Sequence, residues 1–442
     1  MGSDLTTNSG IFASKARSTL LASSVALTFI SWGLLLSLQP AFYPSEAESK
    51  GSTPAQYGLV FGIVSLGGFI SSPIFAHFGG KIGTKILCNV SGFVQGMTAL
   101  AFGGLENVND TWTFIGCSYL LRFIDGVANA AGSAAIVSIL MALLPGYESS
   151  IPGWTQMCLG LGYIIGPVLG SLLFEFGGFG LPFYIFGGII LFLAFDLLLI
   201  VPNIKPGTAA RDHKSLAHDS KPPLTIKSVF KSFNLSLPFF DKFVLYYGTG
   251  IFESMLQPHM INSEAQATQF EVTMAFLIVA GCYMVTTPIT GYVCDKMKCP
   301  ILLSIVGNFL LFASFIFIGP SPFLVGLPPS VSLILGMMPF LGLGYGLVSV
   351  STFSRAYKEC IRQGYRDDVD TYFVLTSLWT ASFHLGNFLG PTIAGIIVNA
   401  IGFPNTTQIS MFMFLLMTIL DCILYYFDNR GSMTQNKYEN LS

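Results

Sequence analysis

Charge is scarce in this chain. Only 10% of its 442 residues are Asp, Glu, Lys or Arg, whereas a soluble globular protein carries roughly 25%. This composition excludes an ordinary water-soluble domain. The formal net charge is −2, so the chain also lacks the basic excess that a nucleic-acid partner would favour.

Patterns for metal binding, disulfides and catalysis are missing as well. The eight cysteines form no Cys-x-x-Cys pair, and most of them lie in apolar runs. Spaced Cys or His pairs are what structural metal sites and disulfide frameworks normally show. No nucleophile–base pairing is visible either, so we expect no metal, no cofactor and no enzymatic activity.

Apolar residues, by contrast, are abundant. They make up 52% of the chain, with 47 Gly and 40 Phe, as membrane helices with small-residue packing faces require. One span takes roughly 20 apolar residues. We therefore predict an all-α membrane protein of about twelve spans, near residues 18–40, 55–77, 86–105, 112–144, 154–175, 181–201, 238–260, 270–292, 299–319, 331–354, 371–400 and 408–428.

A polar stretch divides these runs into two sets of six. We predict a short N-terminal tail over 1–17, a first six-helix bundle over 18–201, a linker over 202–237, a second bundle over 238–428 and a tail over 429–442. The first apolar run is longer than a signal-peptide core and has no clear cleavage site, so it is interpreted as a span.

The basic residues predict the orientation of the chain. Of the 21 Lys and Arg, Arg122 lies inside a span and Lys50 alone lies in a loop facing away from the cytosol if both termini are cytosolic. Such a bias is typical of the cytosolic side. Asn109 and Asn405 then begin Asn-x-Thr sequons in outward loops, which makes both candidates for glycosylation.

The two sets of spans resemble each other in sequence. A repeat of six spans in one orientation predicts two bundles related by an axis along the membrane normal, with substrate held between them. Shared helix-packing chemistry is the alternative explanation. The matching segments are Leu38-Gln39-Pro40 with Leu256-Gln257-Pro258, Pro73-Ile74 and Lys81 with Pro288-Ile289 and Lys296, and Gly162-x-x-x-Gly166-Pro167 with Gly386-x-x-x-Gly390-Pro391.

The repeat and three stretches, over 40–51, 307–322 and 389–403, resemble the major facilitator superfamily, and within it the vesicular amine transporters of solute carrier family 18. The polyamine branch is the most similar. The resemblance implies the major facilitator fold and proton-coupled amine exchange. The chain departs from the polyamine branch at the end of the tenth span, Thr352-Phe353-Ser354-Arg355, where that branch carries an acidic residue, and it lacks the first-span aspartate of monoamine transporters.

A loop motif follows the eighth predicted span. Gly291-x-x-x-Asp295-Lys296 resembles the superfamily's cytosolic loop motif, in which a carboxylate at a helix end pairs with basic groups and holds one access state. The alternative is that these charges only satisfy the orientation rule. In the first half Gly80 takes the aspartate position, while three motif residues remain: Lys81, Gly83 and Lys85.

A glycine face is predicted in each half. Gly162, Gly166 and Gly170 are four residues apart and share one helix face, which allows close helix packing, and Pro167 interrupts the backbone pattern. The motif resembles that of proton antiporters in the superfamily; packing without a role in coupling is the alternative. The second half has Gly386, Gly390 and Pro391, but Ala394 replaces the last glycine.

The fourth predicted span carries two charges. Arg122 and Asp125 are three residues apart and can pair on one helix face. A charged residue in the bilayer costs about 2.5–3.5 kcal/mol on insertion scales and is a functional candidate by default. We predict Asp125 as proton carrier, with Arg122 balancing its charge; a static ion pair is the alternative.

A substrate site is predicted around Glu253. It precedes Gln257 by four residues, near Pro258, where we expect the helix to loosen and expose carbonyl groups. Gln39 is the counterpart of Gln257 in the first half. These three side chains are predicted to coordinate an ammonium group; a Glu253 that faces water without binding is the alternative.

Other ionisable residues in apolar runs are weaker candidates. His384 is included in the substrate site, although a buried, hydrogen-bonded histidine is the commoner situation. Asp196 and Asp421 fall near predicted helix ends, so interfacial positions are expected. Aromatic residues such as Trp379 could surround a cation, but packing and lipid contact account for most of them.

Excess intramembrane carboxylates favour a cationic substrate. The predicted function is proton-coupled antiport of a polyamine or monoamine, loading vesicles or another acidic organelle, by a monomer in the bilayer. Two alternatives stay open: a facilitator or multidrug-type exporter of hydrophobic cations at the plasma membrane, and a non-transporting membrane sensor on a degenerate transporter fold.

Overall fold

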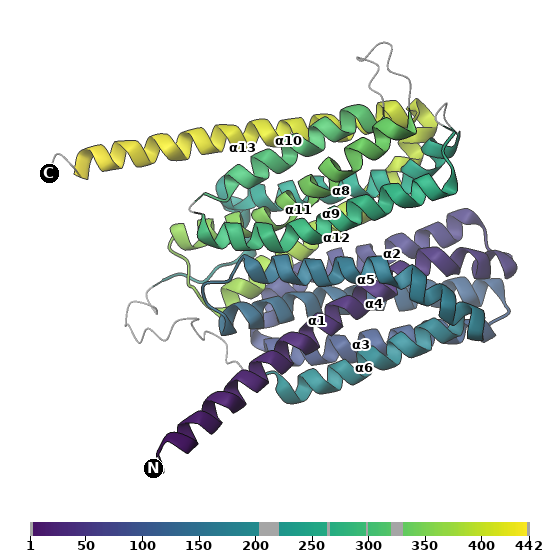
Figure 1. Ribbon diagram of the computed structural model, residues 1–442, viewed down its shortest axis with the longest axis horizontal. Coiled ribbons are helices and arrows are strands. Elements are labelled where there is room, and N and C mark those ends of the chain that lie inside the picture. Colours follow the sequence, from purple (N-terminus) through teal and green to yellow (C-terminus); the bar gives the residue numbers. More distant parts are fainter. Residues whose placement is uncertain (1–2, 203–220, 263–265, 298, 320–329, 440–442) are drawn as a thin grey trace. The chain divides into compact units, whose positions relative to one another are not determined.

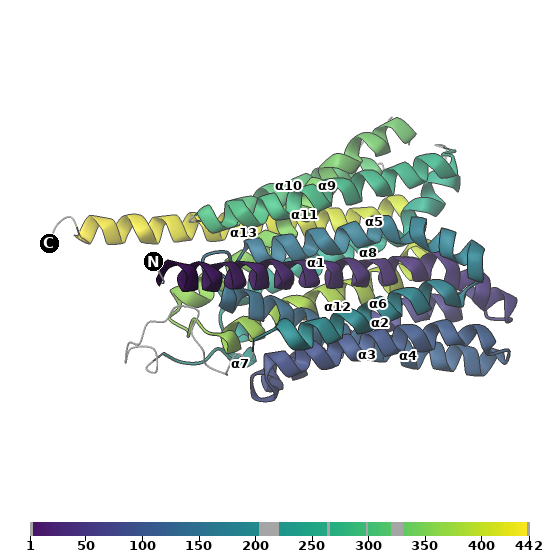
Figure 2. The same ribbon diagram turned by 60° about the horizontal axis from the view of Figure 1, so that its bottom comes forward.

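The computed structural model describes residues 3–202, 221–262, 266–297, 299–319 and 330–439, and the regular elements within these ranges are all helices. Residues 203–220, half of the predicted linker, and the end of the predicted C-terminal tail lie outside the described residues. Figures 1 and 2 show the helices in two views.

The first half of the chain contains six long helices and one short 3₁₀ turn. Their bounds are α1 (Ser3–Ser49), α2 (Pro54–Ile82), α3 (Thr84–Gly104), η1 (Leu105–Asn107), α4 (Thr111–Leu143), α5 (Ser150–Gly177) and α6 (Gly180–Ile200).

The second half repeats this plan after a short helix. Its elements are α7 (Ile226–Lys231), α8 (Phe233–Asn262), α9 (Gln269–Lys296), α10 (Ile301–Ile318), α11 (Val331–Arg362), α12 (Val369–Ile401) and α13 (Phe403–Glu439).

Eleven helices in the described part of the chain are long and apolar enough to cross a membrane. The long helix outside this set is α8, which contains Asp241, Lys242 and Glu253 within 30 residues. Its charged residues, and not a short length, therefore keep α8 outside this set. Charged residues in spanning helices normally face the protein interior, and Asp241 and Lys242 are fully buried.

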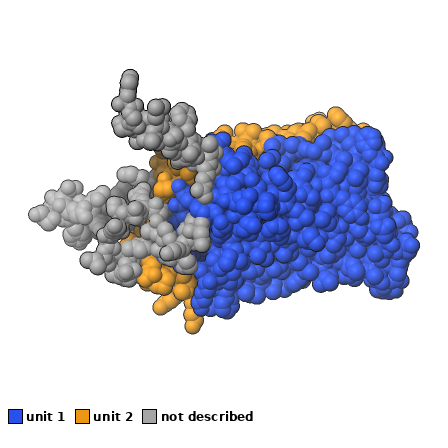
Figure 3. Space-filling model, turned by 90° about the horizontal axis from the view of Figure 1, so that it is seen from below, with its two compact units in different colours: residues 1–143, 158–210, 368–377 blue, residues 144–157, 211–367, 378–442 orange. Residues whose placement is uncertain are grey.

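The helices cluster into two compact units, coloured separately in Figure 3. Unit 1 comprises residues 1–143, 158–210 and 368–377. Within it α2 and α3 both pack on α4, and α3 lies beside α6, as Figures 1 and 2 both show.

Unit 2 comprises residues 144–157, 211–367 and 378–442. Within it α11 packs against α8, α9 and α10, while α13 packs on α10 and α8. Helices α5 and α12 each contribute to both units, because the first turns of α5 cluster with unit 2 and residues 368–377 with unit 1.

The prolines do not interrupt the helices as expected. Helix α1 continues through Pro40 and Pro44 to Ser49, α5 continues through Pro167, and α8 continues through Pro258 to Asn262. A proline removes one backbone hydrogen bond, and the surrounding helix tolerates that loss here. The predicted loosening at Pro258 is therefore wrong.

Candidate functional site

Arg122 and Asp125 form an ion pair on α4. Nη1 of Arg122 lies 2.5 Å from Oδ2 of Asp125, and Arg122 is 3% exposed. Helical spacing of three residues brings the two side chains onto adjacent positions. The predicted pairing is confirmed, and it places a guanidinium and a carboxylate together in the interior of unit 1.

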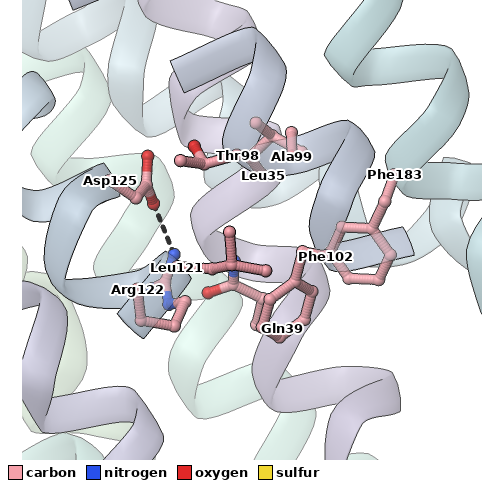
Figure 4. A pocket seen from close by; sticks show the side chains of 9 residues that line it. All are labelled: Leu35, Gln39, Thr98, Ala99, Phe102, Leu121, Arg122, Asp125 and Phe183. Carbon is pink, nitrogen blue, oxygen red and sulfur yellow. Dashed lines mark hydrogen bonds and ion pairs between the residues drawn. The ribbon is translucent and has the colours of Figure 1, made fainter. Parts of the chain in front are cut away.

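A small cavity adjoins this ion pair (Figure 4). Its volume is about 10 Å³, which is room for roughly one water molecule. Gln39 of α1 lies in its wall, and both Oε1 of Gln39 and Nε of Arg122 are buried with no hydrogen-bond partner among the described residues. The cavity thus joins Gln39 to the charged pair, and it is too small for an amine substrate. Its lining residues are Leu35, Gln39, Thr98, Ala99, Phe102, Leu121, Arg122, Asp125 and Phe183.

The other predicted substrate residues lie in unit 2. Glu253 in α8 has an accessible side chain, and it makes no ion pair with any residue that the structure describes. Gln257, one turn further on, is exposed and donates to Oε1 of Gln269 over 3.3 Å. His384 in α12 is 3% exposed, and neither ring nitrogen has a hydrogen-bond partner within the described ranges.

A buried cluster of charges in unit 2 was not predicted. Arg355 of α11 donates two hydrogen bonds to Asp421 of α13, at 3.0 and 2.7 Å, and one to Asp241 of α8, at 3.3 Å. Both aspartates are 0% exposed. The expectation that the Asp421 side chain snorkels to the membrane interface is therefore wrong, because the side chain is buried against α8, α10 and α11. Asp196, the other residue placed there, is half-buried and accepts a hydrogen bond from Ser24.

Lys242 is buried beside this cluster but takes different partners. Its Nζ lies 3.6 Å from the ring centroid of Trp379 and 4.7 Å from that of Tyr246, and donates to Oγ of Ser349 over 2.8 Å. An ammonium over an aromatic face is electrostatically stabilised. Trp379 thus does face a cation, one that belongs to the protein.

The loop motif caps a helix. Asp295, at the end of α9, accepts hydrogen bonds from the backbone N–H of Ser149 at 2.8 Å and of Ser150 at 2.9 Å, and also from the Ser150 hydroxyl. Ser150 begins α5, so the carboxylate satisfies free N–H groups and meets the positive end of the helix dipole. Gly291 allows this approach, because a Cβ there would meet the Ser149 carbonyl and Ser150. Lys296 is exposed.

The first-half copy uses a different arrangement. An added Cβ at Gly80 would meet the carboxylate of Asp370, in the first turn of α12. Gly83 joins α2 to α3 with a φ of +95°, a conformation that side chains other than glycine rarely adopt. Lys81 is exposed and Lys85 half-buried.

The glycine faces pack helices in both halves. A Cβ at Gly162 would meet the Ile30 carbonyl and Gly33 on α1, and Gly166 and Gly170 face the next turns of that helix. In the second half Gly386 and Gly390 face α8 at 243–250, and Pro391 meets Gly250. The predicted close packing is confirmed in each half.

The two sequons lie in different surroundings. Asn109 is exposed between η1 and α4. Its neighbour Asp110 caps α4, and the hydrogen bonds from the side chain and backbone of Thr113 lower the pKa of this carboxyl. Asn405 is exposed but lies in the first turn of α13, not in a loop, and donates to the Ile401 carbonyl over 2.7 Å.

Long apolar helices in two similar sets, with a buried ion pair inside each unit, define a polytopic membrane carrier. The Major Facilitator Superfamily model matches residues 21–364. The chain belongs to this superfamily, and it is a multi-pass integral membrane transporter, not an enzyme.

Curated relatives agree with this assignment. The chain is 27% identical to the human MFS-type transporter SLC18B1 over 405 residues, covering 90% of this chain and 84% of the relative. It is 23% identical to the human synaptic vesicular amine transporter over 381 residues, covering 83% and 66%. The similarity to solute carrier family 18 predicted from sequence is confirmed.

Solved structures show the same fold. The transporter FucP in its outward conformation matches with a TM-score of 0.69 at 14% identity, covering 91% of this chain and 97% of that one. The human organic anion transporter MFSD10 matches with a TM-score of 0.67 at 15% identity, covering 91% and 98%. The expected twelve-helix major facilitator fold is thus confirmed.

Proposed function

We propose that this transporter exchanges a small organic cation, a polyamine or monoamine, for protons by alternating access. The bundles over 18–201 and 238–428 are the moving bodies, the termini are cytosolic, and a monomer suffices. The exchange loads vesicles or another acidic compartment.

The main support for this proposal is that Glu253 has no ion-pair partner among the described residues. It is an accessible carboxylate on a helix that otherwise carries buried charges, and no described residue neutralises it by an ion pair. An accessible carboxylate with no ion-pair partner, on a membrane-spanning helix, attracts cations. An ammonium group of the substrate supplies the missing charge.

The coupling step is assigned to Asp125 and Arg122. Arg122 keeps its proton at all working pH values, so Asp125 is the member of the pair that can bind and release one. The adjoining cavity, with its unsatisfied Gln39 and Arg122 atoms, has room for one water that would carry the proton to or from the carboxylate. Gln39 therefore supports the coupling site instead of touching substrate, while Gln257 and His384 remain candidates for the substrate site.

The relatives support the substrate class and the membrane. One is named a synaptic vesicular amine transporter, which agrees with a cationic substrate and a vesicle membrane. Asp295, which joins the end of α9 to the start of α5, is proposed to hold one access state.

Transport into liposomes tests the proposal. Purified protein is reconstituted with an acidic lumen, and uptake of labelled spermidine and of a labelled monoamine is measured with and without the pH gradient. We expect gradient-dependent uptake of one cation, abolished by Glu253→Gln and uncoupled from the gradient by Asp125→Asn. Glu175→Gln, at an exposed carboxylate in α5, is the matched control and keeps full uptake.

The other outcomes point elsewhere. Uptake that ignores the gradient would make the protein a facilitator or an exporter driven by membrane potential. Absence of flux for cations, anions and neutral solutes alike would leave the non-transporting sensor.

A further inference from the structure

The charged cluster of unit 2 holds more hydrogen-bond acceptors than donors. Asp241 and Asp421 bring two carboxylates to one guanidinium, that of Arg355, and the cluster is buried in the protein. Removing two carboxylates from water is costly unless each is fully paired. Arg355 binds Asp421 with two short bonds but reaches Asp241 with only one, of 3.3 Å.

Asn308 of α10 shows where a donor is missing. Its Nδ2 donates to Oδ1 of Asp241 over 3.0 Å, whereas its own Oδ1 is buried with no hydrogen-bond partner among the described residues. Asn308 is 0% exposed. Turning the amide over would set two oxygens against each other, so in either orientation one acceptor lacks a hydrogen.

Lys242 does not fill this need. It is the remaining charged side chain next to the cluster, on the same helix as Asp241, but it is directed to Ser349, Trp379 and Tyr246. The elements packed around Asp241 otherwise contribute Arg355 from α11, Asp421 from α13 and the neutral Asn308 from α10.

We propose that Asp241, supported by Asn308, Arg355 and Asp421, is a second proton-binding site of this transporter. When Asp241 is protonated, the Asn308 amide turns over so that its Oδ1 replaces Nδ2 beside Asp241 and accepts the O–H, and Arg355 binds Asp421 alone. When the proton leaves, Arg355 is shared between the two carboxylates. The site lies in unit 2, apart from the Arg122–Asp125 pair of unit 1, so each half of the repeat would hold one proton.

Infrared spectroscopy of the purified protein tests this site without a transport assay. The carbonyl stretch of a protonated carboxylic acid, identified by its shift in D₂O, is followed from about pH 5 to 9. We expect a band that titrates in the wild type and is missing in Asp241→Asn. Asp125→Asn, which alters the other site, retains it. If Asp241→Asn does not fold, Asn308→Leu is used, and it shifts the band because the acceptor of the O–H is lost.

Sodium is the competing occupant, since carboxylate and amide oxygens also bind hard cations. The titration is therefore repeated with N-methylglucamine in place of sodium. A midpoint that moves with sodium would overturn the assignment of the site to protons alone, and a wild-type spectrum that Asp241→Asn leaves unchanged would overturn the site itself. The inference adds to the proposed function but does not depend on its substrate, because the band is measured even if neither amine is transported.

Discussion

The carboxylate of Asp295 lies 2.8 Å from the backbone nitrogen of Ser149, although 146 residues separate them in the chain. One side chain at the end of α9 thereby closes the start of α5. A loop motif recognisable by its spacing acts here as the cap of a distant helix.

Neutralising this carboxylate should weaken the cap. Asp295→Asn keeps the shape but loses the charge that faces the positive helix end, so we expect the free energy of unfolding to fall by about 1 kcal/mol. Thermal unfolding followed by tryptophan fluorescence measures the loss. Lys296→Gln, at the exposed neighbouring residue, should leave Tm unchanged; an equal fall in both variants would show that the cap is not the cause.

Close packing at Gly162 should make it intolerant of a methyl group. A Cβ there would strike the backbone of α1 at Ile30 and Gly33, and overpacking of this kind costs about 1–3 kcal/mol. Gly162→Ala should therefore lower Tm clearly. Gly188→Ala is the control, because nothing lies within 4 Å of a Cβ at Gly188. Equal tolerance at the two positions would contradict the packing argument.

Lys50 should matter for stability. Its Nζ donates to the carbonyls of Leu105, Glu106 and Val108, each at 2.8 Å, and pairs with Glu46 at 3.1 Å. Lys50→Met leaves these acceptors without their donor, and hydrogen bonds to charged groups contribute about 1.5–3 kcal/mol each. We expect a large fall in Tm, compared in the same assay with Lys81→Met at an exposed lysine. A negligible fall would mean that water replaces the ammonium without loss.

The contact between Lys242 and Trp379 should appear as coupling between two mutations. Trp379→Leu removes the nearer of the two aromatic rings beside the buried Lys242 ammonium, a contact that contributes about 2 kcal/mol when desolvated. Lys242→Met removes the charge itself and should change Tm little, because an apolar replacement of a buried charge is often neutral. In Lys242→Met/Trp379→Leu the loss should be smaller than the sum of the single losses. Strict additivity would exclude the contact as a source of stability.

Sequence reasoning succeeded where partners are close in the chain. Arg122 and Asp125 share one helix face, and the spacing of the glycines reports a packing face directly. Arg355, Asp241 and Asp421 come from three helices, with 114 and 66 residues between the bonded pairs. No short-range sequence pattern predicts contacts between residues so far apart in the chain. The sequence does show Asp241 and Lys242 together inside an apolar run. Because charged side chains are costly to place in a bilayer, this pair alone marks the segment as a candidate site.

Helix continuity is a second difference between expectation and structure. Pro258 suggested a break because a proline cannot donate its backbone hydrogen bond. In the structure α8 stays helical to Asn262. Leu256 and Met260 are buried in the hydrophobic core on either side of Pro258, and this tertiary packing is not visible from the local sequence.

Gly80 and Asp370 show that the two halves supply an acid at this position in different ways. At the end of α9 the acidic residue is Asp295, which belongs to the loop motif. At the end of α2 the same motif position is Gly80, and the nearby acidic residue is Asp370 in the first turn of α12. The two halves follow a similar path of the chain, but this acid comes from a different helix in each. The effect of substituting Asp295 therefore cannot be transferred to Gly80, although both residues hold the same position in the two halves.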